Sequence, residues 1–436
     1  MGERGQSAIL GDGSLADAIK QFDKKFKEKS GLKWEDRGQD PKPSKYVFVE
    51  RSYVPDEDET SQTDEIAPKK PSSHDAPKCT LEPPVRALME LIFNQQYFAA
   101  TMDSLNYDAN KMPLGKLSKT TIIRGFQALK NLSALFDDPS LAVEYDMSAA
   151  EATEHLSNLY YSLIPHAFGR NRPPVIAHSG QLKQEIDLLE SLSDLKDADN
   201  IIKAEKNSGD EMHALDTRFQ SLGMQEMSPL SPESGEFSQI KQYLVNTRGE
   251  THHISYDVID IFRIERNGEL DRFQKSGYAD MASDRRLLWH GSRATNYGGI
   301  LGQGLRIAPP EAPVSGYMFD KGDLILHIMI ALQRLTNLIG IYLADMSSKS
   351  ANYCYPDISD GHALLLLCEA ELGKPMQTLT DAKYDAGEEA KKLGVYSTWG
   401  QGMIGPEGWK DAECVHASLA GVMMVRPNGP HNVGPC

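Results

Sequence analysis

The stretch LLWHGSRATNYGGILGQGLRIAPPEAPVSGYMF, residues 287–319, decides the interpretation of this chain. A predicted strand ends at His290, Gly291 and Ser292. Strand ends aim side chains at clefts, and a glycine lets a ligand approach the backbone closely. His290 and Ser292 can hydrogen-bond hydroxyl or amide groups, and a planar amide suits the N–H and C=O of Gly291. A single histidine at a strand end is nevertheless more often structural than catalytic.

The surrounding region, residues 236–436, is predicted to be rich in strands with short helices between them. YDVIDIFRIER (256–266), RRLLWHG (285–291) and HALLLLCEAEL (362–372) follow strand patterns, and Gly, Pro and Asn separate them. Residues 207–236 carry prolines and glycines without a clear period, so we expect a loop there.

Residues 82–215 are predicted to form a helical bundle, because apolar residues recur at helical spacing. Proline and glycine separate the helices. The stripes by themselves indicate a packed core rather than a cofactor site. They comprise Val85, Leu88, Met89, Ile92 and Phe93; Ile122, Ile123, Phe126, Leu129 and Leu132; Leu156, Leu159, Tyr160 and Leu163; and Leu182, Ile186, Leu189 and Leu192.

The N-terminal residues 1–53 form a unit whose core is too thin for a complete domain. Ser14 is predicted to cap a helix, and KYVFVERSY (45–53) is predicted to be a strand. The apolar face of the helix is formed by Leu15, Ile19, Phe22 and Phe26. Residues 54–81 are polar and rich in acids, proline and serine, which indicates a disordered linker.

Composition excludes some classes of protein. The formal net charge of -16 argues against nonspecific nucleic-acid binding by the whole chain, although a local basic face is compatible with it. The five cysteines have no disulfide-like spacing, which favours a reducing compartment. The N-terminus has no apolar secretory segment, and the apolar run 324–339 is shorter than the roughly 20 residues of a membrane span.

Several motifs in order carry a resemblance to a known family. RRLLWHGSR, GLRIAPPEAP, SGYMF and LADMSSKSANYCY together resemble the catalytic domain of the poly(ADP-ribose) polymerases. LEPPVRALMELIF, KMPLGKLSK, LSNLYYSLIPHAFG and YDVIDIFRIER are similar to the helical regulatory domain and catalytic start of the DNA-damage-responsive members. GLKWEDRGQDPKPSKYVFVERSY is similar to the end of the WGR domain that precedes them in that family.

The resemblance implies a reaction on NAD, in which the bond between nicotinamide and ribose breaks and ADP-ribose passes to a protein or a growing chain. An oxocarbenium-like ribose must then be stabilised while a nucleophile is activated, as in glycoside hydrolysis. NAD is the substrate, and no metal is expected.

The family pattern also implies roles for individual residues. It places Gly291, Ser292 and Ser350 on the nicotinamide carboxamide, with Tyr353 stacked on the ring and His290 on the adenosine ribose. His290 and Tyr342 are the catalytic candidates. The remaining residues expected at the pocket are Asn296, Arg306, Tyr317 and Lys349.

One residue of the family pattern has no counterpart. The family carries a glutamate in a C-terminal strand of the form Asn-Glu-Tyr-Ile-Val-Tyr, where its carboxylate polarises the acceptor hydroxyl. None of the glutamates after Tyr353 lies in such a stretch, and the chain stops at a segment similar to the loop before that strand. The Trp-Gly-Arg signature and early strands of the WGR domain are also absent. We therefore expect a chain truncated at both ends, with weakened DNA contacts and weak or absent polymer synthesis.

An apolar segment interrupts the resemblance. In the family the Lys-Gly pair is followed directly by Ile-Tyr, whereas here the 18 residues 323–340 separate Gly322 from Ile341. Three interpretations compete: an insertion helix, a lid or partner-binding element, and translated intron. The apolar face of the insertion helix would consist of Leu324, Ile328, Ala331, Leu332 and Leu335. The apparent truncation favours the third.

Two weaker signals remain. GQGMIG (400–405) fits a dinucleotide-binding pattern, but no strand is expected before it, and a loop is the better interpretation. The spacing of Cys414, His416, His431 and Cys436 fits no strong zinc template.

Together these observations predict a multidomain α+β chain. We expect a partial WGR-like unit (1–53), a linker (54–81), an all-α regulatory bundle (82–215) and a β-rich ADP-ribosyltransferase domain (236–436). The implied function is NAD-dependent poly(ADP-ribosyl) transfer in the nuclear response to DNA damage, with damaged DNA and protein acceptors, including the chain itself, as partners and no membrane. The alternative is an inactive NAD-binding or scaffold fragment. An NAD-dependent oxidoreductase is disfavoured, since no Rossmann fingerprint lies between a strand and a helix.

Overall fold

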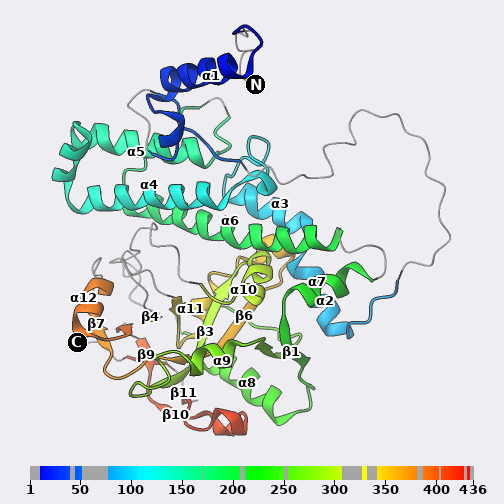
Figure 1. Ribbon diagram of the computed structural model, residues 1–436. Helices are drawn as coiled ribbons and strands as arrows, with labels where there is room; N and C mark the ends of the chain where they lie inside the picture. The colour runs from blue at the N-terminus through cyan, green and yellow to red at the C-terminus, as the bar shows by residue number, and fades with distance from the viewer. Residues whose placement is uncertain are drawn as a thin grey trace.

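A computed structural model of the chain describes residues 10–39, 45–51, 77–169, 171–206, 212–249, 254–306, 327–330, 341–380, 386–401, 404–426 and 430–432. A layer of helices lies over a β-rich part, and α1 stands apart at the N-terminal end (Figure 1). This confirms the predicted multidomain α+β class. Of the helices in the described part of the chain, none has the length and apolarity needed to span a bilayer.

The N-terminal unit contains α1 (Leu15–Ser30) and a turn of 3-10 helix. Ser14 caps α1 as predicted, since its side chain accepts a hydrogen bond from the Asp17 N–H. The aromatic rings of Phe22, Phe26, Trp34 and Phe48 pack edge to face or stacked. The rest of the apolar face stays in solvent, with Leu15 76% exposed.

The prediction of a strand at 45–53 is wrong for the residues that the structure describes. Residues 45–51 contain only a single bridge, from Arg51 to Leu117. The Arg124 guanidinium and the Thr121 hydroxyl of the bundle instead donate to the backbone oxygens of Phe48 and Glu50. Side chains of the bundle thus take the place of a partner strand.

The helical bundle begins at a proline-led helix and ends with a short helix beyond the long α6. Its elements are α2 (Pro83–Ile92), α3 (Gln95–Ser104), η3 (Leu114–Lys116), α4 (Lys119–Asp137), η4 (Pro139–Tyr145), α5 (Ala149–Leu163), α6 (Ser179–Lys206) and α7 (Ala214–Ser221). The predicted helical stripes fall on α2, α4, α5 and α6. Side-chain caps start several of these helices, and at α5 Ser148 and Glu151 form a reciprocal capping box.

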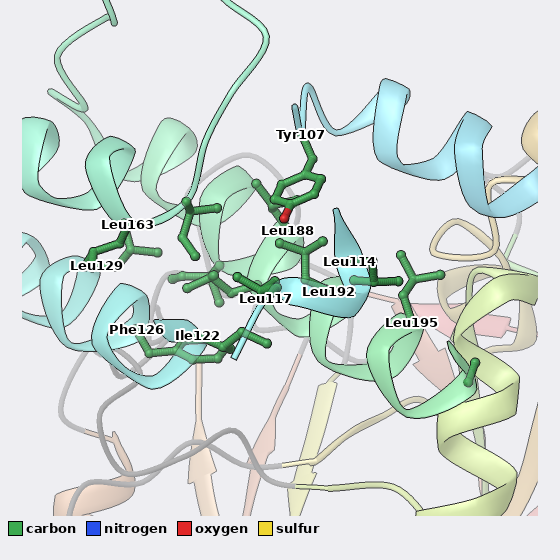
Figure 2. Close-up of a cluster of buried hydrophobic side chains, with 14 of the residues drawn as sticks. Tyr107, Leu114, Leu117, Ile122, Phe126, Leu129, Leu163, Leu188, Leu192 and Leu195 are labelled. Atoms are coloured by element: carbon green, nitrogen blue, oxygen red, sulfur yellow. The ribbon is translucent and has the colours of Figure 1, made fainter. Parts of the chain in front are cut away.

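The core of the bundle is formed by these stripes. Phe126 and Leu129 of α4, Leu163 of α5 and Leu192 of α6 are at most 1% exposed. Figure 2 shows these side chains gathered between the helices. The same cluster of buried residues continues into the β-rich part through Tyr297, Ile300 and Leu301 of α10 (Tyr297–Gln303). The two parts therefore share one hydrophobic core.

The β-rich part begins inside the segment that we predicted to be a loop. Residues 207–236 include α7 and β1, and α8 starts at Gly235, so that prediction is wrong. The elements that follow α7 are β1 (Met224–Pro229), α8 (Gly235–Asn246), β2 (Phe262–Arg266), α9 (Glu269–Gln274), β3 (Arg285–Ser292), η5 (Ala294–Asn296), α10, β4 (His327–Ile330), β5 (Ile341–Leu343), α11 (Ser347–Ala351), η7 (Pro356–Ser359), β6 (Leu364–Glu371), β7 (Gln377–Leu379), α12 (Ala386–Leu393), β8 (Ser397–Gly400), β9 (Ile404–Pro406), β10 (Trp409–Asp411), η8 (Ala412–Cys414), η9 (Ala417–Leu419), β11 (Met423–Val425) and β12 (Pro430–Asn432).

Two four-stranded sheets hold the centre of this part. Their strand orders are β10-β11-β3-β6 and β5-β4-β8-β7. β3 and β6 pair antiparallel along eight residues, from Arg285–Glu371 to Ser292–Leu364. The backbones of Trp289 and Ala344 exchange two hydrogen bonds of 2.7 and 2.9 Å, which joins the first sheet to the end of β5. The strands predicted at 285–291 and 362–372 are confirmed, and the one predicted at 256–266 is limited to β2.

The insert at 323–340 lies mostly outside the described residues. Residues 327–330 form β4, which pairs antiparallel with both β5 and β8. This contradicts the interpretation of these four residues as part of an insertion helix. The expectation that no strand precedes GQGMIG is also wrong, since β8 ends at Gly400.

Candidate functional site

The predicted site residues come together around one cavity. Its volume is about 410 Å³, and it lies where β3, β5 and α11 face the helices α4 and α6. Nine of the ten predicted residues line it: His290, Gly291, Ser292, Asn296, Arg306, Tyr342, Lys349, Ser350 and Tyr353. Tyr317 lies outside the described residues.

Gly291 allows β3 to lie directly against α11. A Cβ at this position would be 1.9 Å from the backbone oxygen of Ser350 and 2.6 Å from its carbonyl carbon. The Ser350 hydroxyl donates to the Trp289 oxygen at 2.9 Å, which ties the same two elements together. Any side chain at residue 291 would therefore separate two walls of the cavity.

The hydrogen bond of His290 determines its tautomer. Nδ1 lies 3.0 Å from the backbone oxygen of Tyr342, and a carbonyl oxygen can only accept, so Nδ1 carries the proton. Burial lowers the pKa of His290 and favours the neutral ring. Nε2 is then the hydrogen-bond acceptor of the ring, and it can receive a hydroxyl proton from a ligand.

Ser292 and Asn296 form the next part of the wall. The Asn296 amide donates from Nδ2 to the Ser292 hydroxyl oxygen at 2.9 Å. Asn296 is 5% exposed, and its Oδ1 has no hydrogen-bond partner. A buried amide oxygen without a partner is costly, so it favours a ligand that brings a donor.

Helix α6 supplies the opposite wall, which the sequence analysis missed. Asp187, Glu190 and Asp194 line the cavity, and they are the only carboxylates among its described lining residues. Desolvation raises the pKa of Asp194 to about 6 and also raises the pKa of Asp187. The i, i+3, i+7 spacing of the three acids places them on one helical face, a signal that could have been recognised beside the apolar stripe.

Arg306 forms ion pairs with acids of α6, the helix that supplies this wall. It forms ion pairs of 2.9 Å with Asp194 and 2.6 Å with Asp197. Nearby, the Arg293 guanidinium lies 4.0 Å from the ring centre of Tyr355 and donates to the Ser191 hydroxyl at 3.2 Å. The two arginines of the β-rich part that line the cavity thus contact α6.

No glutamate of the strand-rich part reaches the cavity among the residues that the structure describes. Glu369 and Glu371 lie on β6, where Glu369 pairs with Arg285 and Glu371 accepts from Ser283 and from the Asp284 N–H. Their carboxylates therefore stabilise the start of β3 and do not act at the site.

Comparison with known families agrees with this architecture. The family model described as the regulatory domain of poly(ADP-ribose) polymerase matches residues 79–219, and the catalytic-domain model matches 234–325 and 339–422. A WGR domain model matches residues 1–41. The unmatched residues 326–338 fall inside the predicted insert.

Individual relatives extend over nearly the whole chain. The chain is 38% identical over 411 residues to poly [ADP-ribose] polymerase 2-A of Oryza sativa subsp. japonica, with 93% of this chain and 56% of the relative covered. It is 37% identical over 415 residues to poly [ADP-ribose] polymerase 2 of Homo sapiens, covering 93% and 64%. The chain thus spans between half and two thirds of the length of these relatives. On its regulatory and catalytic domains together, the chain belongs to the poly(ADP-ribose) polymerase family.

Proposed function

We propose that this chain comprises the regulatory and catalytic parts of an NAD-dependent poly(ADP-ribosyl)transferase. The observation that carries the proposal is the convergence of nine predicted residues, from separate segments of the chain, on one cavity. Bound there, NAD supplies the bond between nicotinamide and ribose that breaks on transfer.

In this proposal, different walls of the cavity bind the two ends of the substrate. The Gly291 backbone and the Ser350 side chain are the groups for the carboxamide, and the Tyr353 ring offers an aromatic face to the nicotinamide. His290 Nε2 accepts from a ribose hydroxyl. The unpartnered Asn296 Oδ1 accepts a donor from the adenosine half.

Helix α6 regulates access in this proposal. A dinucleotide carries negative phosphates, and the Asp194 and Asp197 carboxylates of α6 repel them while they hold Arg306. Glu190 adds little to this repulsion near pH 7, because desolvation raises its pKa to about 8. Movement of α6 away from the cavity would remove the repulsion and release Arg306 for the phosphates. DNA damage is the signal that we assign to this movement, and the nucleus is the compartment.

Residues 1–436 on their own are proposed to synthesise little or no polymer. The carboxylates at the described cavity all come from α6, where they face the substrate from the regulatory side. None is placed to polarise an acceptor hydroxyl in the way the family glutamate does.

Incubation of the pure chain with labelled NAD and nicked DNA tests this point. A human relative serves as the positive control, and intact DNA serves as the negative one. We expect labelled polymer from the relative only. Robust polymer from residues 1–436 would contradict the proposed loss of polymer synthesis, while it would support the transferase activity itself.

The second candidate is an inactive module that retains NAD or nicotinamide analogues. The same absence of a suitably placed carboxylate at the described cavity favours it. Calorimetry with a nicotinamide analogue, combined with a labelled-NAD assay for residual transfer, distinguishes the candidates. Binding with weak transfer supports the impaired enzyme, and binding with none supports the inactive module. Damaged DNA and protein acceptors are the partners proposed for the active enzyme.

A further inference from the structure

A second cluster of chemically active side chains lies away from the cavity, where the chain enters and leaves the helical bundle. Cys79 Sγ, a ring nitrogen of His213 and a carboxylate oxygen of Asp216 all lie within 4.8 Å of one another. It is the one group of this kind among the residues that the structure describes.

Each residue is held in place by its position in the fold. Cys79 belongs to the extended segment before α2, His213 is the N-cap of α7, and Asp216 lies in the first turn of α7. Asp216 is 5% exposed, while Cys79 and His213 are half-buried. α2 and α7 pack against each other, so the three side chains converge from two packed segments (Figure 1).

The surrounding hydrogen bonds orient the carboxylate. The backbone N–H of Thr80 donates to both carboxylate oxygens of Asp216 at 3.1 Å, and the Thr80 hydroxyl donates to Oδ1 at 2.8 Å. Such outer partners fix the orientation of carboxylate ligands in metal sites. Thr80 therefore holds Asp216 in place and leaves the cysteine and histidine to face it.

We propose that Cys79, His213 and Asp216 bind a Zn²⁺ ion, with water as the fourth ligand. Sulfur, imidazole nitrogen and carboxylate oxygen are the ligands that zinc takes in proteins. The Cys79 sulfur lies 3.9 Å from Asp216 Oδ1. Two ligands at tetrahedral angles on zinc, at about 2.3 Å for sulfur and about 2.0 Å for oxygen, are separated by about 3.5 Å. The ligand atoms of Cys79 and Asp216 therefore need only small movements, and the His213 ring nitrogen starts within 4.8 Å of both.

Zinc binding replaces existing interactions of Cys79 and His213 with metal–ligand bonds. The Cys79 thiol loses its proton to solvent and binds as the thiolate. His213 Nδ1 now accepts from the Leu215 N–H at 3.2 Å, and coordination through either ring nitrogen replaces this hydrogen bond. Zinc retains its oxidation state, and the products released to solvent are the thiol proton and the hydration waters that the three side chains displace.

Without a metal, hydrogen bonding accounts for only part of the cluster. Thr80 explains why Asp216 is buried, and the N-cap explains His213. The Cys79 thiol donates only a long, weak hydrogen bond of 3.9 Å to Asp216 Oδ1, and metal coordination would give this sulfur a stronger interaction with the cluster. The ion would fasten the incoming segment of the bundle to its outgoing helix and so limit how far the bundle can shift.

The experiment is a titration of the full chain, freed of metal and of any affinity tag, with Co²⁺ as a spectroscopic probe and then with Zn²⁺ in competition. We expect one equivalent of cobalt, with thiolate-to-metal charge-transfer absorption and the d–d bands of a four-coordinate ion. Zinc should displace it. Absence of stoichiometric binding would overturn the proposal.

Substitutions of the proposed ligands test which residues bind the ion. Cys79→Ser and His213→Gln should each weaken zinc binding more than about tenfold, because loss of a ligand costs at least as much as loss of an outer partner. Cys414→Ser is the matched control, since Cys414 is exposed and lies near His416, a zinc candidate from the sequence. It should leave binding unchanged. Full binding by Cys79→Ser, or loss of binding in Cys414→Ser, would refute the assignment, and circular dichroism checks that each variant is folded.

Discussion

Gly291 shows how a single missing side chain shapes the cavity. The β3 backbone at this position lies so close to Ser350 that a methyl group would overlap the Ser350 carbonyl. Overlap with backbone atoms cannot be relieved by a change of rotamer, so one of the two elements must move.

Gly291→Ala should therefore lower the affinity for a nicotinamide analogue more than tenfold and destabilise the fold by about 1–3 kcal/mol. Gly277→Ala is the control, because a Cβ at Gly277 meets no atom within 4 Å. Calorimetry and thermal unfolding measure the two effects. Wild-type affinity in Gly291→Ala would show that the close approach of β3 and α11 is not needed for the site.

Asp345 is a buried acid between Tyr342 and Lys349 on the segment that forms one wall of the cavity. It is fully buried, and neither carboxylate oxygen has a hydrogen-bond partner among the described residues. Desolvation raises its pKa from 3.8 to about 7. The folded chain therefore holds a proton on Asp345 between about pH 4 and pH 7, where the unfolded chain does not. Stability falls as pH rises through that window.

Asp345→Asn should remove this pH dependence. We expect the variant to gain stability over the wild type at pH 8, with the difference shrinking toward pH 5, where Asp345 is already neutral in the folded chain. Denaturant unfolding at several pH values measures it, with the exposed Asp257→Asn as the control. A difference that does not change with pH would mean that Asp345 does not titrate in this range.

At the residue scale, the sequence predicted the cavity residues of the β-rich part because they lie in contiguous motifs. His290, Gly291 and Ser292 are adjacent, and Lys349, Ser350 and Tyr353 share one short segment. The roles of these residues stay predictions. The acids of α6 were missed, because a polar face on a long amphipathic helix has the same pattern whether it meets solvent or another domain.

At the scale of elements, α10 packs unusually closely against α6. A Cβ at Gly298 would be 2.8 Å from the Cβ of Ala198, and a Cβ at Gly299 would be 2.9 Å from the backbone oxygen of Asp194. Gly302, on the same helix, has room, since its nearest neighbour would be 3.7 Å away. The two crowded glycines let the β-rich part lie directly on the regulatory helix.

Gly298→Ala should separate α10 from α6 and destabilise the fold, whereas Gly302→Ala should be neutral or stabilising. Both substitutions bring the same gain in helix propensity, about 1 kcal/mol, so their difference isolates the contact with α6. Thermal unfolding measures it. Equal melting temperatures for the two variants would show that α10 can move away from α6 without loss of stability.

Elements with strong local patterns were predictable, and those defined by distant partners were not. The apolar residues of the bundle recur at helical spacing, and the residues of β3 and β6 follow strand patterns, so the local sequence alone indicates each element. The residues before Arg51 have strand composition, but the bundle offers side chains rather than an open strand edge. Residues 327–330 have an apolar sequence that suits a helix or a strand, and pairing with β5 and β8 decides between them.

At the scale of the whole molecule, the ion pairs of Arg306 join the regulatory and β-rich parts across the cavity. Asp194 and Asp197 both lie on α6, while Arg306 follows α10. Their charges oppose a bound polyanion in two ways, by repulsion and by occupying the arginine.

Asp194→Asn combined with Asp197→Asn should therefore raise the affinity for ADP-ribose by about tenfold, with a stronger effect at low salt. Asp199→Asn is the control, because Asp199 lies on the same helix and pairs with Lys203 instead. Calorimetry at two salt concentrations provides the measurement. Unchanged affinity would place the phosphates away from Arg306.

The core that α10 shares with the bundle has a consequence for cooperativity. Because Tyr297, Ile300 and Leu301 are buried among residues of the helices, the two parts cannot separate as rigid bodies without wetting a continuous apolar surface. Small displacements of α6 expose little of this apolar surface and cost little free energy, whereas full detachment exposes all of it and costs much more. The regulatory and catalytic parts should thus melt as one calorimetric unit. In the regulation proposed above, the cavity would open through local loosening of α6 rather than through release of the bundle.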